Sequence, residues 1–153
     1  MRVGIGFDAH RFEVGRRLVL GTIVIDHDRG LAGHSDGDVL THAIVDAILG
    51  AAGLGDIGTH FPSSDERWKG ADSTVFLTRT IGAVKAEGFA VASVDATVIC
   101  ESPRLEGYRE KMRSALAGVI ESDALSVKAT STDTMGFTGR SEGIAAIAVA
   151  LLQ

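Results

Sequence analysis

The sequence predicts one α/β domain, an α+β sandwich with a single mixed β-sheet and helices packed on one of its faces. Three observations lead to this class. Apolar runs with the period-2 spacing of strands alternate with segments whose apolar residues repeat at helical spacing. The 153 residues fit one domain, 1–153, with neither a linker nor an internal repeat. Hydrophobic residues make up 45% of the chain and aromatic residues only 5%, so aliphatic and alanine side chains are expected to fill the core.

Several short apolar stretches have the composition of strands. The first, Val3–Phe7, alternates with glycine and predicts a strand that ends at a loop carrying Asp8. Two short runs, 18–20 and 23–25, predict a hairpin or an edge pair, and the polar stretch Asp26–Gly30 predicts a turn. Later strands are predicted at Phe89–Cys100, Leu125–Thr132 and Gly143–Leu152, with a Gly-Phe-Thr-Gly loop before the last.

Three segments have the amphipathic spacing and end signals of helices. The first covers about Asp38–Ala52, after a cluster of good N-cap residues. Ser73 is expected to cap the second, which stops at Gly88, and the third covers Tyr108–Ile120. The intervening segment Gly55–Asp72 has no periodicity, and at roughly 18 residues it is longer than ordinary connections, which favours a functional loop.

Charge and cysteine content exclude several functions. The net charge of −5 and the pI near 5.5 argue against a nucleic-acid-binding surface, which requires Lys and Arg to neutralise phosphates. The single Cys100 can form neither an internal disulfide nor a cysteine-based zinc site, which suits a reducing cytosol. No apolar run approaches the length of a membrane span, and no signal peptide is evident. A cytoplasmic protein is therefore expected, either alone or as one module of a longer fused chain.

One group of residues has the composition of a metal site. Asp8 and His10 lie two apart in a strand and so project to the same side, and His42 lies on the first predicted helix. Two imidazoles and a carboxylate form a three-ligand set for zinc that leaves one coordination position open. Asp38 and Asp46, each four residues from His42, are candidates to orient its ring. The alternative is a set of capping carboxylates and solvated histidines, and the spacing alone leaves both interpretations open.

Two further segments have groups that suit phosphate. His34–Asp38 enters a helix N-terminus, where free N–H groups attract phosphate oxygens, and Ser35 can cap the helix, bind phosphate or do both. Thr130–Asp133 precedes Gly136–Arg140, which together supply the hydroxyls, carboxylate and cation that a diphosphate with a hard cation needs. An ordinary N-cap and a threonine-rich edge strand explain the same residues equally well.

Several blocks occur together in one order along essentially the whole chain: Gly4–His10, Ala32–Asp38, Leu54–Gly58, Phe61–Pro62, Lys69–Ser73, and Lys128–Thr130 through Gly136–Arg140. In this combination the chain resembles the 2-C-methyl-D-erythritol 2,4-cyclodiphosphate synthase family of the non-mevalonate isoprenoid pathway. The resemblance implies a lyase that converts 4-diphosphocytidyl-2-C-methyl-D-erythritol 2-phosphate into the cyclic diphosphate and CMP. It also implies a homotrimer with active sites between adjacent subunits.

The resemblance further implies the roles of individual residues. Zinc would be held by Asp8, His10 and His42, and a second divalent cation, Mg²⁺ or Mn²⁺, would lie near Asp133. His34 and Ser131 are the candidate catalytic residues, which would polarise phosphate oxygens. The substrate-binding residues would be Asp8, Ala9, His10, His34, Ser35, Asp56, Ile57, Gly58, Phe61, Pro62, Ser63, Ser64, Asp65, Cys100, Pro103, Arg104, Leu105, Thr130, Ser131, Thr132, Asp133, Phe137 and Arg140.

In the family, side chains that match Phe137, Arg140 and Glu142 surround a cavity on the threefold axis that can hold an isoprenoid diphosphate. Four positions depart from the family pattern: Asp133 for Glu, Ser131 for Thr, Arg104 for Lys, and Ser63 for Asp. The first three preserve the chemical group, although the shorter Asp133 is expected to reach the cation through water. Ser63 removes one acceptor for a substrate hydroxyl.

Two other functions fit parts of the pattern. A metal-dependent phosphohydrolase would use the same metal ion to activate water and would release CMP with a linear diphosphate. A non-catalytic trimeric binding protein would use zinc structurally, but three protein ligands leave zinc open, whereas structural sites are usually closed by four.

Overall fold

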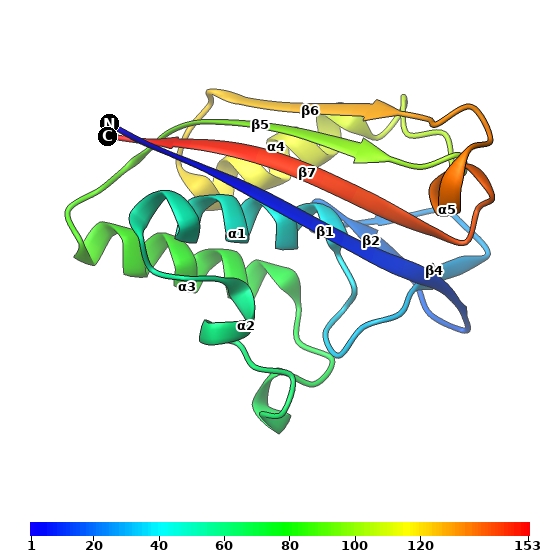
Figure 1. The fold of residues 1–153 in the computed structure, drawn as a ribbon, viewed down its shortest axis with the longest axis horizontal. Coiled ribbons are helices and arrows are strands. Elements are labelled where there is room, and N and C mark those ends of the chain that lie inside the picture. The colour runs from blue at the N-terminus through cyan, green and yellow to red at the C-terminus, as the bar shows by residue number, and fades with distance from the viewer.

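The computed structural model describes residues 1–153 as a five-stranded sheet with helices packed on one face (Figure 1). The strands lie in the order β4-β1-β7-β5-β6; β5 and β6 are parallel, and the other neighbours are antiparallel. This arrangement confirms the predicted mixed sheet. The strand bounds are β1 Arg2–Val14, β4 Arg29–Leu31, β5 Val91–Ile99, β6 Leu125–Thr130 and β7 Gly143–Leu152. A separate hairpin pairs β2, Leu18–Leu20, with β3, Ile23–Ile25.

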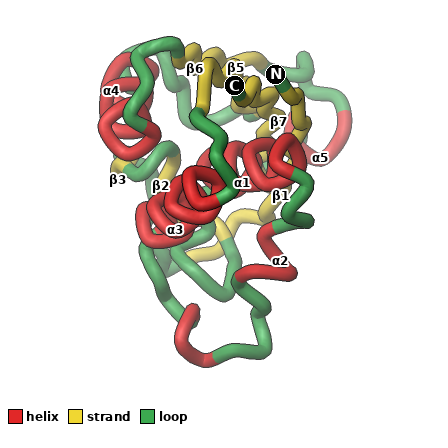
Figure 2. Tube along the Cα trace, turned by 90° about the vertical axis from the view of Figure 1, so that its left-hand side faces the viewer, coloured by secondary structure: helices red, strands yellow, loops and turns green.

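Three long helices cover a single face of the sheet, as the side view in Figure 2 shows. They are α1, Val39–Ala52; α3, Ser73–Ala86; and α4, Arg109–Ile120. Three short turns of helix lie in the connections: α2, Ile57–His60; η1, a 3-10 turn at Glu66–Trp68; and α5, Gly136–Gly139. None of the helices combines the length and the apolar character that a membrane crossing requires.

Glycines bring β1 into direct backbone contact with α1. A Cβ atom added to Gly6 would lie 2.0 Å from the carbonyl oxygen of Ala43, and one added to Gly4 would lie 2.1 Å from that of Ala47. The helix therefore rests on the strand with no side chain between them. Because side chains alternate along a strand, Asp8 continues the glycine face and points toward the helices.

The opposite face of the same strand is apolar and uncovered. Val3, Ile5 and Phe7 are 69%, 66% and 58% exposed, and the adjacent β7 adds Ile147 and Val149, which are also exposed. We call these five residues the apolar sheet face. The predicted alternation in the first strand is confirmed, but its large apolar side chains lie outside the core of the single chain.

A buried carboxylate joins the hairpin to two helices. Asp38 is fully buried and accepts hydrogen bonds from the backbone N–H groups of Gly21, Thr22 and Thr41. Its second oxygen also accepts from the hydroxyls of Thr41 and Ser73. A buried carboxylate is tolerated only when donors satisfy it. The hydrogen bonds to Asp38 also fix the segment that leads into α1.

The structure corrects several predicted boundaries. β1 does not end at Asp8 but continues to Val14, because its last residues pair with β4. The predicted turn at 26–30 therefore contains the start of β4. Asp72, rather than Ser73, caps α3, and the Gly-Phe-Thr-Gly segment forms the helical turn α5. β5 and β6 lie within their predicted ranges, and Asp38, rather than Ser35, caps the first helix.

Candidate metal centre and substrate pockets

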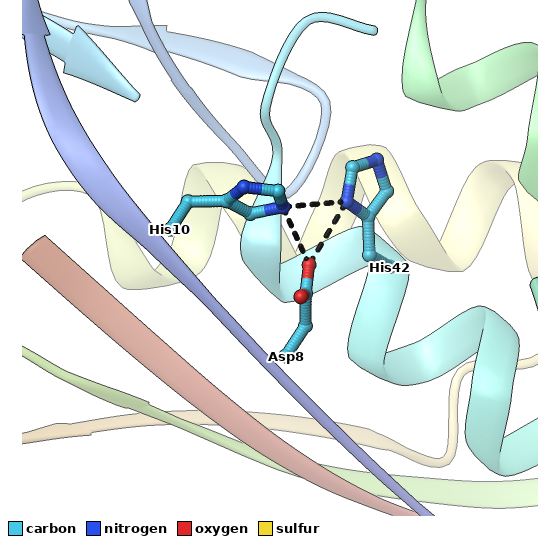
Figure 3. Close-up of side chains that lie close together, drawn as sticks. All are labelled: Asp8, His10 and His42. Atoms are coloured by element: carbon cyan, nitrogen blue, oxygen red, sulfur yellow. Dashed lines mark hydrogen bonds and ion pairs between the residues drawn. The ribbon is translucent and has the colours of Figure 1, made fainter. Parts of the chain in front are cut away.

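The structure brings Asp8, His10 and His42 together (Figure 3). Oδ2 of Asp8 lies 2.9 Å from Nε2 of His10 and 3.0 Å from Nδ1 of His42, and the two nitrogens are 3.3 Å apart. β1 supplies the first two residues, and the first turn of α1 supplies the third. The expected cluster therefore forms within one chain.

The triangle of ligand atoms has the size that a tetrahedral metal ion requires. An ion bound at about 2.0–2.1 Å, the usual zinc–nitrogen distance, separates its ligands by about 3.3 Å. Burial opposes the ionisation of Asp8, but hydrogen bonds from His10 and His42 outweigh it and hold the pKa of this carboxyl far below its usual range. The carboxylate is therefore ready to bind a cation, and the donor set fits a divalent metal.

Ser35 contacts the far side of the His42 ring. Its buried hydroxyl lies 3.2 Å from Nε2, so it can accept that N–H and leave the Nδ1 lone pair toward the metal position. The prediction that Asp38 or Asp46 orients this ring is wrong. The first carboxylate binds the free N–H groups around its helix N-terminus, and Asp46 accepts from the backbone N–H of Ile57 at 2.7 Å.

A pocket of about 270 Å³ opens beside the triad. Six predicted substrate-binding residues line it beyond the metal ligands: His34, Ser35, Ile57, Gly58, Phe61 and Ser63. Trp68 and Phe76 complete its wall: the Phe61 ring lies edge-on to Trp68 at a centroid distance of 5.2 Å and tilted against Phe76 at 4.7 Å. The sequence spacing of Trp68 and Phe76 did not predict that they line the pocket, because they come from two separate elements, η1 and α3.

Five other predicted residues do not line this pocket: Ala9, Asp56, Pro62, Ser64 and Asp65. The Asp56 carboxylate instead caps α2 through Thr59. Asp65 caps η1 and pairs with Arg67 at 2.6 Å. Ala9 lies on the sheet face opposite the triad, since it is one residue from Asp8 in a strand.

A second pocket of about 360 Å³ lies at the carboxyl ends of β5 and β6. Six predicted residues meet there: Cys100, Pro103, Arg104, Leu105, Thr130 and Ser131. Sequence reasoning missed Glu106 and Arg109, because the first lies in the loop before α4, the second begins that helix, and neither carries a motif. Burial, and then the adjacent Glu101, raises the pKa of the Cys100 thiol to about 11, so the thiol is protonated at neutral pH.

Two predicted residues of the same segment do not line this second pocket. The Thr132 hydroxyl donates to the Met135 carbonyl oxygen at 2.6 Å. Asp133 adopts a left-handed backbone conformation, with φ of 50°, and its carboxylate lies 3.4 Å from the Ser131 hydroxyl. It therefore lies next to the pocket, with its carboxylate exposed.

The two pockets share one end of the sheet. The pairing register places Asp8, Ala146, Val98 and Ala129 in one row across β1, β7, β5 and β6. Three strand spacings of about 4.8 Å separate the ends of this row by about 14 Å. Both ends of the row point to the helix face, so the metal triad and the second pocket lie on the same side of the sheet.

Phe137 and Arg140 lie on and just after α5, away from both pockets. The Arg140 guanidinium pairs with Glu142 at 2.6 Å, and the Phe137 ring is partly exposed. All three predicted residues thus gather at the turn that leads into β7.

Fold and site together define an α/β enzyme with a candidate metal triad and two pockets at one end of its sheet. The YgbB family matches residues 1–153, and the 2-C-methyl-D-erythritol 2,4-cyclodiphosphate synthase of Salinibacter ruber is 52% identical over 155 residues, covering 100% of this chain and 99% of the relative. The chain belongs to the YgbB family, that of the 2-C-methyl-D-erythritol 2,4-cyclodiphosphate synthases, as the sequence motifs predicted.

Other relatives have the same domain in a longer protein. The bifunctional enzyme IspD/IspF of Erythrobacter litoralis is 54% identical over 152 residues, which are 98% of this chain but only 39% of that protein. The bifunctional IspDF of Campylobacter jejuni has a TM-score of 0.95 at 42% identity, covering 99% of this chain and 42% of its own.

A solved relative of about the same length as this domain is a 2C-methyl-D-erythritol-2,4-cyclodiphosphate synthase described as bound to CDP. It has a TM-score of 0.91 at 34% identity, and the match covers 99% of this chain and 100% of that one.

Proposed function

We propose that the protein is a 2-C-methyl-D-erythritol 2,4-cyclodiphosphate synthase, a phosphorus–oxygen lyase of non-mevalonate isoprenoid biosynthesis. It converts 4-diphosphocytidyl-2-C-methyl-D-erythritol 2-phosphate into the cyclic diphosphate and CMP. The observation that carries this proposal is the triad of Asp8, His10 and His42, assembled at metal-binding distances in a chain 52% identical over its whole length to a synthase of that name.

The reaction needs positioning and charge neutralisation more than proton transfer. An oxygen of the 2-phosphate attacks the β-phosphorus, the bond between that phosphorus and the bridging oxygen breaks, and CMP leaves with the bridging oxygen and its electron pair. Because the attacking oxygen is already anionic near pH 7, no strong general base is required. His34 and Ser131 hydrogen-bond to phosphate oxygens as charge develops on them. The first lines the metal pocket and the second lines the other pocket.

The metal triad is assigned to Zn²⁺, since two imidazoles and one carboxylate form a three-ligand zinc set. Zinc, when bound, supplies positive charge that neutralises phosphate oxygens beside the reacting atoms. Asp133 is the proposed contact for a second cation, Mg²⁺ or Mn²⁺, on the diphosphate. Its exposed carboxylate beside Ser131 supports this role.

The second pocket is assigned to the cytidyl diphosphate. Arg104 and Arg109 both line it, and neither forms an ion pair within the chain, so their charges are free for a diphosphate. A solved relative described as bound to CDP supports the same class of ligand. At the metal pocket, the segments Asp56–Gly58 and Phe61–Asp65 contact the erythritol and phosphate part, chiefly through the lining residues Ile57, Gly58, Phe61 and Ser63, and Ala9 contributes only its backbone.

We propose a homotrimer in which one subunit's metal pocket faces the cytidyl pocket of its neighbour. The apolar sheet face supports assembly, because exposed contiguous apolar surface on a soluble protein marks an interaction site. The turn with Phe137, Arg140 and Glu142 then surrounds an axial cavity that accepts an isoprenoid diphosphate. The proposed location of the enzyme is the cytoplasm.

Phosphorus NMR of the protein with the cytidyl substrate and Mg²⁺, with and without a chelator, tests the function. A cyclic diphosphate together with CMP, both lost on chelation, is the expected result. A linear diphosphate with CMP would make water the nucleophile and identify a phosphohydrolase. Unchanged substrate would contradict the proposal and favour a binding protein.

A further inference from the structure

A single side chain holds the segment Gly33–Ser35, which borders the metal pocket. The Arg16 guanidinium, from the turn between β1 and β2, donates from Nη1 to the Gly33 carbonyl oxygen at 2.7 Å. Its Nη2 donates to the Ser35 carbonyl oxygen. The two acceptors lie on either side of His34. We propose that Arg16 is a positioning residue for the reaction, which holds His34 and both metal-binding imidazoles in place; the proposal rests on the function proposed above.

The held segment contacts both imidazoles of the metal triad. A Cβ atom added to Gly33 would lie 3.5 Å from Cε1 of His10, so this backbone rests against that ring. The Ser35 hydroxyl lies 3.2 Å from Nε2 of His42. Between them, His34 lines the pocket itself. A displacement of the segment therefore moves the support of two metal ligands and a candidate catalytic residue at once.

The turn that carries Arg16 is itself held by packing and by an ion pair. The turn packs on β4 so closely that a Cβ atom on Gly30 would lie 2.2 Å from the Arg17 carbonyl oxygen. The Glu13 carboxylate lies 3.5 Å from Nη1 of Arg16, and the Arg16 side chain is half-buried, with 29% of its surface exposed. The donors thus project toward the segment from a turn that is packed against β4.

Arginine suits this role better than lysine. Its planar guanidinium presents several N–H donors in a fixed fork and binds two acceptors at once, whereas one ammonium is a compact point donor. The His34 carbonyl lies between the two carbonyls that Arg16 binds. It accepts a hydrogen bond from the backbone N–H of Gly70 at 2.7 Å. All three consecutive carbonyls are therefore held, two of them by Arg16 alone.

The test compares Arg16→Ala with Arg17→Ala, which removes the same charge from an exposed neighbour that makes no side-chain hydrogen bond. Three quantities are measured: kcat and KM for cyclisation, the affinity for Zn²⁺ alone in competition with a chromophoric chelator, and the restoration of both by added guanidinium ion. Thermal unfolding of each variant shows that it is folded.

Arg16→Ala is expected to lower kcat by about 10- to 100-fold and zinc affinity by about 10-fold, the usual effect of losing support around a metal site. Guanidinium is expected to restore part of both. Arg17→Ala is expected to match the unmodified protein and to gain nothing from guanidinium.

A folded Arg16→Ala protein that matches Arg17→Ala in kcat and zinc affinity would overturn the proposal, as would a loss that guanidinium does not reverse. If Arg16→Ala fails to fold, Arg16→Lys takes its place in the test. Unchanged kcat and zinc affinity in Arg16→Lys would equally overturn the proposal. The zinc titration needs no turnover, so it tests Arg16 even if the unmodified protein forms no cyclic product and the proposed function fails.

Discussion

The hydroxyl of Ser35 lies 3.2 Å from Nε2 of His42, on the side of the ring away from Asp8. A ring whose Nε2–H donates to this hydroxyl presents the Nδ1 lone pair to a metal ion once Nδ1 gives up the proton that it donates to Asp8. Ser35 is therefore placed to orient a candidate metal ligand without contacting the atom that would bind the ion.

Replacing Ser35 with alanine is expected to weaken Zn²⁺ binding by about 10-fold, because the His42 ring loses its orienting partner. Competition titration with a chelator measures the affinity. Ser126→Ala, at an exposed position on β6, is the matched control and should bind zinc normally. His42→Ala marks the limit of the effect and should lose both zinc retention and cyclisation while remaining folded. Equal affinity in Ser35→Ala and the unmodified protein would show that the ring needs no such support.

Gly6→Ala is expected to destabilise the protein by about 3 kcal/mol or more, because the new Cβ would lie 2.0 Å from the backbone oxygen of Ala43 and overpacking at rigid backbone is costly. Urea unfolding gives the free energy of unfolding. Gly82→Ala in α3 is the control: a Cβ there meets nothing within 4 Å and should stabilise by about 0.5–1 kcal/mol through helix propensity. A stable Gly6→Ala protein would mean that α1 can move away from β1.

Cys100 is expected to resist alkylation in the folded protein. With its pKa raised to about 11 by burial, the group stays in the neutral thiol form well above neutral pH. Only about one thiol in a thousand is ionised at pH 8, roughly 100-fold less than for an ordinary cysteine. Iodoacetamide labelling followed by mass spectrometry, in buffer and in 8 M urea taken as roughly the denaturing limit, compares the rates. Similar rates in both would contradict a protected thiol.

Ile5→Asp is expected to prevent assembly, since it places a charge in the middle of the apolar sheet face. Light scattering after size exclusion should give the mass of one chain, and cyclisation should be lost because the proposed trimer places each active site between two subunits. Val24→Asp, on the hairpin strand β3, changes another exposed apolar residue outside that face and should leave the trimer intact. A trimeric Ile5→Asp protein would place the interface elsewhere.

The sequence patterns that predicted the metal triad are local ones. Residues two apart in a strand point to the same face, wherever the strand ends. Asp8 and His10 therefore share a face in the longer β1 just as they did in the shorter predicted strand. His42 lies on a helix whose N-cap at Asp38 and left-handed Gly53 are strong end signals. The family motifs then joined these separate segments into one site.

Contacts between distant segments left no such signal. β4 has three residues, too few to show any period. Spacing along a helix gave Asp38 and Asp46 equal access to His42, yet backbone N–H groups from other segments bind both carboxylates. Arg109 reaches the second pocket only because α4 begins beside the end of β5. Such partners depend on tertiary packing and not on spacing.

The tight fit of β1 against α1 has a consequence for how this strand can evolve. Its odd-numbered positions from Val3 to Phe7 belong to the apolar sheet face, and its even-numbered positions from Gly4 to His10 provide first the contact with α1 and then two candidate metal ligands. A one-residue insertion or deletion near Phe7 would exchange the two faces for all residues beyond it. Point substitutions can adjust either face alone, but a change in the length of β1 would displace the candidate metal ligands and disrupt the apolar sheet face in a single step.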